Sequence, residues 1–222
     1  MKIEKASFEI LEPLTSRFGE SISKKEVLDR EKILSIIEKA GRTCYKSEAK
    51  GDASSFIRGL IRNGHHSVIE HASMTVKFIC DRGVTHELVR HRLASYSQES
   101  TRYCNYSKDK FGNEITVIKP PGLSAGEDDE IWIRAMQHAE NAYLEMIDTG
   151  LSPQIARSVL PNSLRAEIVM TANMREWRHV LTLRTSEKAH PQIRSLMLRL
   201  LCILREWLPE LFEDIPLPLG EG

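Results

Sequence analysis

Two long stretches of the chain alternate apolar and polar residues with a period of two. One stretch places Ala72, Met74, Val76, Phe78 and Cys80 on the same side, and the other does so with Leu164, Ala166, Ile168, Met170 and Ala172. A shorter alternation near the amino terminus involves Ala6, Phe8 and Ile10. Because successive side chains of a strand point to opposite faces, each stretch predicts a strand with one buried face.

Helical spacing and boundary signals occupy much of the remaining chain. Residues 24–40 predict a helix that Gly41 ends, residues 53–62 predict a second helix, and residues 84–91 fit a third. Residues 108–126 contain two prolines and three glycines, so we expect an exposed excursion there.

The later helices have clearer start signals. Ser124-x-x-Glu127 has the spacing of a capping box and predicts a helix up to Gly150. Ser152-Pro153 predicts the start of another helix, which ends by Pro161. Asn173 is placed to cap a helix that reaches about Arg184, and residues 193–207 carry the apolar stripe of a final helix.

Strands separated by an irregular number of helices indicate an α+β fold. We expect a mostly antiparallel sheet flanked by helices, in a single domain that covers residues 1–222. The chain has neither a G-x-G-x-x-G sequence nor a phosphate-binding P-loop motif, so a bound dinucleotide would lie outside a Rossmann frame.

Composition narrows the classes of protein that the chain fits. Its 222 residues are 41% hydrophobic, which is enough for a substantial core, and 31 basic residues balance 31 acidic ones. Cys44, Cys80, Cys104 and Cys202 are scattered, so we expect free thiols in a reducing, cytoplasmic setting. The amino terminus has no apolar run of signal-peptide length, and no segment is apolar enough to span a bilayer.

Arginine is concentrated in residues 90–102, which read RHRLASYSQESTR. Arg90-His91-Arg92 is followed by seven residues, then Ser100, one residue and Arg102. Guanidinium groups bind phosphate bidentately and hydroxyls complete the oxygen shell, so this segment suits a ligand with more than one phosphate. A solvated basic face is the simpler alternative, but the segment lacks lysine and includes apolar residues.

The same segment resembles the signature of the flavin-dependent thymidylate synthases, in which Arg-His-Arg precedes a serine by seven residues. Residues 65–71 resemble the family's His-x-Ser/Thr-x-x-Glu-His segment, and residues 157–161 its Ala-Arg-x-x-Leu-Pro segment. Asn173 with Arg175, and Leu183 with Arg184, resemble its late motifs. The resemblance runs from about Gly64 to Arg184, in the same order.

The resemblance implies an enzyme that converts dUMP to dTMP in a homotetramer whose active sites lie at subunit interfaces. FAD would be the cofactor, 5,10-methylenetetrahydrofolate the one-carbon donor and NADPH the reductant. The implied FAD-binding residues are Ser67, Arg90, His91, Arg92, Leu93, Gln98, Asn173, Arg175 and His179. The implied dUMP-binding residues are Glu87, Arg90, Gln98, Glu99, Ser100, Thr101, Arg102, Arg157 and Arg184, with Arg184 also catalytic at the uracil ring.

Several of these residues have simpler interpretations. His91 could be a packed or capping histidine, and residue type alone places Leu93 in the core. Arg184 could form a surface salt bridge. Gln98 stands where many family members have glutamate, so only a hydrogen-bonding role survives there.

Residues outside this set carry weaker signals. Ser100 has no base nearby in the sequence and is expected to bind phosphate rather than to act as a nucleophile. Cys104 is similarly expected to be a small buried residue. His65, His66 and His71 could hold zinc in a hydrolase, but their spacing differs from the metalloprotease motifs, so we expect no metal. A nucleic-acid-binding module is the other alternative, and the zero net charge disfavours it.

Overall fold

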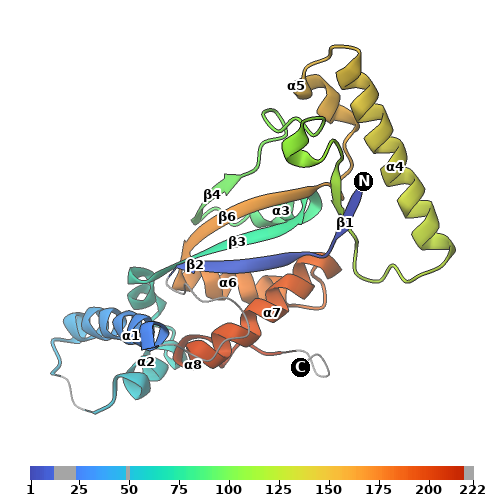
Figure 1. Cartoon of the computed structure of the whole chain (residues 1–222). Coiled ribbons are helices and arrows are strands. Elements are labelled where there is room, and N and C mark those ends of the chain that lie inside the picture. Colours follow the sequence, from blue (N-terminus) through green and yellow to red (C-terminus); the bar gives the residue numbers. More distant parts are fainter. Residues whose placement is uncertain (13–23, 49–50, 218–222) are drawn as a thin grey trace. The chain divides into compact units, whose positions relative to one another are not determined.

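The computed structural model describes residues 1–12, 24–48 and 51–217 (Figure 1). The chain forms two compact units. Unit 1 comprises Met1–Ser7, Phe78–Arg90 and Ser97–Val169. Unit 2 comprises Phe8–Lys77, His91–Tyr96 and Met170–Gly222. The prediction that residues 1–222 form a single domain stays a prediction.

A four-stranded antiparallel sheet confirms the α+β fold class and both long predicted strands. Its order is β2–β3–β6–β4, formed by Ser7–Glu12, Ser73–Asp81, Arg165–Asn173 and Ala94–Gln98. In β3 the residues Met74, Val76 and Phe78 are almost completely buried, and Ile168 and Met170 of β6 are fully buried. The period-two pattern therefore identified the face of the sheet that packs against the core.

Unit 1 contains a second, two-stranded sheet that the sequence did not reveal. Strand β1 (Lys2–Glu4) pairs in parallel with β5 (Thr116–Ile118), and Lys2 lies opposite Thr116. Val117 and Ile118 are fully buried. The expectation of an exposed excursion over residues 108–126 is therefore wrong for residues 116–118. These three residues are too few to show a periodic pattern, and they form a strand because they pair with the distant amino terminus.

Two helices of unit 1 begin differently from the prediction, and a third begins as predicted, after the N-cap Ser152. Helix α3 covers Arg82–Leu88 and α4 covers Glu127–Asp148. Gly126 is the N-cap of α4 and forms no side-chain cap bond, so the predicted capping box is wrong. Four acidic residues in the first turn stabilise this end through the helix dipole instead. Helix α5 (Pro153–Ala156) is a short turn followed by a 3₁₀ segment, η3 (Arg157–Val159). A further 3₁₀ turn, η2 (Asp109–Phe111), precedes β5.

Unit 2 contains the other helices. Helix α1 (Lys24–Tyr45) passes through Gly41 rather than ending there. A β-carbon at Gly41 would lie 2.9 Å from the side chains of both Phe56 and Leu60 of α2 (Ala53–Arg62), so this glycine permits close helix packing. Helices α6 (Met174–Arg184) and α7 (Pro191–Trp207) confirm their predictions, and α8 (Pro209–Phe212) follows. The 3₁₀ segment η1 (His66–His71) precedes β3. Among the described helices, none has the length and apolar character needed to cross a bilayer.

Candidate functional site

In unit 1, the end of the arginine-rich segment forms a tight turn after β4. The backbone N–H of Glu99 donates to the carbonyl of Glu167 on β6, at 2.8 Å, and this bond anchors the start of the turn. The Ser100 carbonyl accepts from the N–H groups of Tyr103 and Cys104, each at 3.0 Å. The Ser100 hydroxyl accepts from the N–H of Arg102 at 3.3 Å. Residues 98–104 are therefore held by bonds within the segment and by the bond to β6, and we call them the nucleotide loop after their predicted role.

Two predicted phosphate-binding arginines meet this nucleotide loop. The Arg157 guanidinium donates to the hydroxyl of Thr101, which is buried, at 3.3 Å. Arg102 Nε donates to the side-chain oxygen of Gln154 at 3.3 Å. Both guanidinium groups are exposed and both of these partners are neutral. The bonds therefore orient the two cations without neutralising them, an arrangement that suits a phosphate.

Gln98 and Glu99 face inward from the nucleotide loop. The Gln98 amide donates to the Thr85 hydroxyl at 3.0 Å. The Glu99 carboxylate accepts from the Tyr106 hydroxyl at 3.2 Å and from the N–H of Glu167 at 3.3 Å. Burial raises the pKa of the Tyr106 phenol, and the neighbouring Glu99 raises it further. These bonds give Glu99 a role in holding the loop, and its contact with dUMP stays a prediction.

Glu87 and Arg90 lie at the other end of the signature, also in unit 1. Glu87 belongs to α3 and is half-buried, whereas Arg90 follows the helix and is exposed. The backbone N–H of Arg90 donates to the Glu87 carbonyl at 3.3 Å. Their predicted contacts with ligands remain predictions.

In unit 2, helix α6 positions the second group of predicted residues. Asn173 is its N-cap, and the side-chain oxygen accepts from the N–H of Glu176 at 2.9 Å. Trp177 is fully buried and its indole N–H donates to the Met74 carbonyl of β3 at 3.0 Å. Since these contacts fix the start and one face of the helix, Arg175 and His179 are left on the exposed side.

A pocket of about 690 Å³ lies along this side of α6. It is lined by Glu70, Leu93, Asn173, Arg175, Glu176 and His179. Four of these are predicted FAD-binding residues. Leu93 is 74% exposed, so its assignment to the core on residue type is wrong. An exposed leucine at a pocket that also carries polar side chains is suited to contact a flat ring system.

The polar rim of this pocket includes an ion pair. Arg175 Nη1 lies 2.6 Å from the Glu70 carboxylate, and both side chains are exposed. Exposed pairs of this kind contribute little stability, so the guanidinium can exchange this partner for a phosphate. Ser67 is exposed on the same 3₁₀ segment as Glu70, and Arg92 is exposed next to Leu93.

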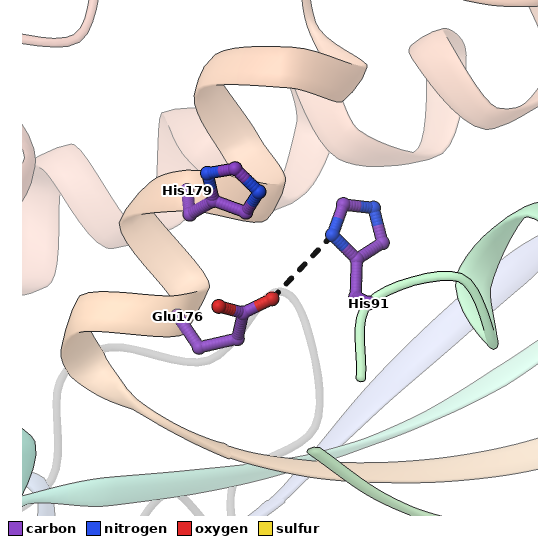
Figure 2. Close-up of side chains that lie close together, drawn as sticks. All are labelled: His91, Glu176 and His179. Atoms are coloured by element: carbon purple, nitrogen blue, oxygen red, sulfur yellow. Dashed lines mark ion pairs between the residues drawn. The ribbon is translucent and has the colours of Figure 1, made fainter. Parts of the chain in front are cut away.

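His91 is buried and lies near three polar side chains of α6, of which Figure 2 shows Glu176 and His179. Arg184 Nε donates to His91 Nε2 at 3.0 Å, and His91 Nδ1 lies 3.5 Å from Glu176 Oε1. The rings of His91 and His179 meet edge to face, with centroids 5.7 Å apart. The packed interpretation of His91 is therefore confirmed, and its contact with FAD remains a prediction.

The protonation states in this cluster follow from burial and charge. Burial lowers the pKa of His91 to about 4, and the nearby Arg184 and His179 contribute in the same direction. Burial raises the pKa of Glu176, although His179 opposes the rise. His91 is thus neutral at pH 7, and its contact with Glu176 joins an uncharged ring to a carboxyl group.

Donor atoms of His91, Glu176 and His179 lie within 4.8 Å of one another, close enough to surround a metal ion. A cation there would face the Arg184 guanidinium on the other side of the His91 ring, and the two charges would repel. Within the described part of the chain, His65, His66 and His71 belong to no such group. The His65 ring instead bonds to the Tyr45 hydroxyl.

Sequence reasoning missed Glu176, Thr85, Gln154 and Tyr106. Glu176 had a detectable signal, because it follows the predicted cap Asn173 by three residues and precedes His179 by three. Thr85 and Gln154 hold the nucleotide loop from α3 and α5, so no local pattern marks them. Tyr106 lies only seven positions from Glu99, but no spacing in the sequence marks the bond between them.

An α+β fold without a Rossmann motif, two exposed arginines bonded at or beside one loop, and a pocket along α6 fit a protein of the nucleotide-binding class. The model of the family described as "Thymidylate synthase complementing protein" matches residues 26–210. The chain is 36% identical over 186 residues to the flavin-dependent thymidylate synthase of Geobacter sulfurreducens, covering 79% of this chain and 78% of that one. The chain belongs to the flavin-dependent thymidylate synthase family.

Other relatives agree in sequence and in fold. The flavin-dependent thymidylate synthase of Mycolicibacterium gilvum is 36% identical over 213 residues, which cover 84% of this chain and 82% of that one. The UMP/dUMP methylase PolB of Streptomyces cacaoi, solved with 5-Br dUMP, has a TM-score of 0.71 at 24% identity and covers 96% of each chain. Thymidylate synthase X of Helicobacter pylori, solved with FAD and dUMP, has a TM-score of 0.67 at 23% identity, covering 82% of this chain and 93% of that one.

Proposed function

We propose that this chain catalyses the reductive methylation of dUMP to dTMP, with 5,10-methylenetetrahydrofolate as one-carbon donor and NADPH as reductant through FAD. The observation that carries the proposal is that residues matching the family's motifs gather at two places, the nucleotide loop and the pocket along α6. Arg102 and Arg157 meet at the nucleotide loop, and Leu93, Asn173, Arg175 and His179 line one pocket.

The donor set of the α6 pocket fits a flavin dinucleotide. Arg175 offers a guanidinium for a phosphate, Asn173 and His179 offer polar atoms, and Leu93 offers an apolar surface. Ser67, Arg90, His91, Arg92 and Gln98 are assigned to FAD by resemblance alone. Bound FAD supplies the redox chemistry, and the side chains bind and orient it.

The nucleotide loop fits the 5′-phosphate of dUMP. Arg102 and Arg157 supply two cations, and Ser100 and Thr101 supply hydroxyls. Glu87, Arg90, Gln98 and Glu99 are assigned to dUMP by resemblance. Arg184 is assigned to the uracil ring, where its charge stabilises negative charge that develops on the carbonyl oxygens in the transition state.

We further propose a homotetramer with active sites at subunit interfaces, a cytoplasmic location and a single domain over residues 1–222. The resemblance supports the tetramer. The scattered cysteines support a reducing compartment, and all four are unpaired in the structure.

A direct assay tests the proposed function. Purified protein should show flavin absorbance, and the absorbance should change when dUMP is added. With dUMP, the folate donor and NADPH it should form dTMP, and omitting any one of these should abolish product. A colourless protein that contains stoichiometric zinc would contradict the proposal.

A further inference from the structure

Arg184 has a buried partner that the family resemblance did not assign to it. Arg184 Nε donates to His91 Nε2 at 3.0 Å, across 93 positions of sequence. Because a guanidinium is planar and rigid, a bond at Nε sets the orientation of both Nη groups as well. His91 is only 5% exposed, and a packed ring is a fixed acceptor rather than a mobile one.

The Arg184 N–H that donates to His91 Nε2 also decides which nitrogen of His91 carries the proton. Arginine donates and never accepts, so Nε2 must be the unprotonated nitrogen of a neutral ring. The proton then sits on Nδ1, which lies 3.5 Å from Glu176 Oε1 (Figure 2). The carboxyl group of Glu176 is buried and lies on the same helix as Arg184. The backbone N–H of Glu176 donates to the side chain of the N-cap residue Asn173. Glu176 is therefore placed to favour the tautomer that Arg184 needs.

We propose that His91 is a positioning residue that orients the Arg184 guanidinium as a neutral acceptor, and that Glu176 fixes its tautomer. The proposal rests on the proposed function in that it gives Arg184 its orientation toward the uracil. It assigns to the histidine of the Arg-His-Arg segment a task separate from binding the flavin.

Protonation of His91 would break this arrangement. Both ring nitrogens would then be donors, and Nε2–H would face Arg184 Nε–H. The groups around His91 are Glu176, His179 and Arg184 of α6, and the Tyr96 hydroxyl of β4, which donates to the His91 carbonyl at 2.9 Å.

Nitrogen NMR of the histidine rings tests the structural half of the proposal without turnover. Protein labelled with ¹⁵N-histidine is measured between pH 5 and 8, and His91→Gln identifies the His91 signals among the eight histidines. We expect a neutral ring protonated at Nδ1 throughout. A ring protonated at Nε2, or one that becomes charged near pH 6.5, would overturn the proposal.

Matched substitutions test the functional half. Glutamine offers an oxygen close to the position of Nε2, whereas leucine offers none. We expect His91→Leu to lower kcat about 100-fold, as displaced catalytic groups do, while FAD content and the KM for dUMP change less than about threefold. His91→Gln should recover to within about tenfold of wild type. His138→Gln, on the exposed face of α4, is the control for a histidine replaced elsewhere.

A double-mutant cycle separates positioning from a general structural role. In Arg184→Lys protein the guanidinium that His91 orients is absent, so His91→Leu should then lower kcat by less than about threefold further. Full additivity of the two losses, or loss of FAD parallel to the loss of kcat, would contradict positioning. If wild-type protein forms no dTMP, the proposed function fails, while the NMR result still decides whether His91 is the acceptor for Arg184. If His91→Leu does not fold, the NMR measurement and the kcat of His91→Gln decide whether the proposal holds.

Discussion

Arg102 and Arg184 are predicted to meet the same nucleotide, but the chain presents them in opposite ways. Arg102 is exposed on the nucleotide loop of unit 1 and bonds to the neutral side chain of Gln154 at 3.3 Å. Arg184 is half-buried at the end of α6 in unit 2 and bonds to buried His91 at 3.0 Å. The Arg102 guanidinium is therefore exposed to solvent, whereas the Arg184 guanidinium is held by a buried side chain.

The difference indicates what each charge can contribute. An exposed guanidinium gains a charge-assisted bond when a phosphate arrives, so its effect belongs to binding. A guanidinium oriented in advance costs no reorganisation when charge develops on the substrate, so its effect belongs to the transition state. A substitution at Arg102 should therefore change mainly the binding of dUMP, and a substitution at Arg184 should change mainly kcat.

The largest effect is expected at Arg184. Arg184→Lys keeps the charge but loses the planar donor, so we expect kcat for dTMP formation to fall by about 100-fold, or about 2.7 kcal/mol. The KM for dUMP should rise much less, and FAD should stay bound. NADPH oxidation that fails while the later, dUMP-dependent step is intact would show that Arg184 serves the reductant instead.

Arg102→Ala should have the next largest effect, and on a different constant. Removing a charge-assisted phosphate contact should weaken dUMP binding by about 1.5–3 kcal/mol, measured by titration, while FAD content changes little. Arg134→Ala, an exposed arginine of α4, is the matched control and should leave dUMP binding unchanged. Equal loss of both ligands in Arg102→Ala would mean that the loop is structural.

The buried partner of Arg184 should make stability depend on pH. The pKa of His91 is lowered to about 4 in the folded protein, so the unfolded chain binds more protons between about pH 6.5 and 4. The contribution of neutral His91 is complete above pH 6.5 and is lost as pH falls toward 4. We expect wild type to lose about 1–2 kcal/mol more than His91→Gln over this range in urea unfolding. Parallel curves would show that His91 titrates normally.

The smallest effect is expected at Cys104. Burial and the nearby Glu99 raise the pKa of its thiol, which disfavours the nucleophilic thiolate. Cys104→Ser should leave turnover within about threefold of wild type in a dTMP assay. Complete loss of activity in a folded, flavin-loaded variant would point to a thiol mechanism.

Prediction from the sequence succeeded where the signals were local. Residues 53–62 and 174–184 are helices with the predicted bounds, because a cap precedes each and an apolar face runs along it. Prediction from the sequence failed where segments that are distant in the chain pair or bond with one another. Strand β5 depends on pairing with β1, and the bond between His91 and Arg184 joins residues 93 positions apart. Residue type misplaced Leu93 for the same reason, because the exposed side of the α6 pocket is defined by residues from separate elements.

Product formation in a single turnover tests the central claim most directly. Protein whose flavin has been reduced by NADPH, and freed of excess NADPH, is mixed without oxygen with dUMP and 5,10-methylenetetrahydrofolate. The account predicts one dTMP formed for each flavin reoxidised, and no flavin oxidation when the folate donor is omitted. Flavin that stays reduced, or reoxidation without dTMP, would contradict it.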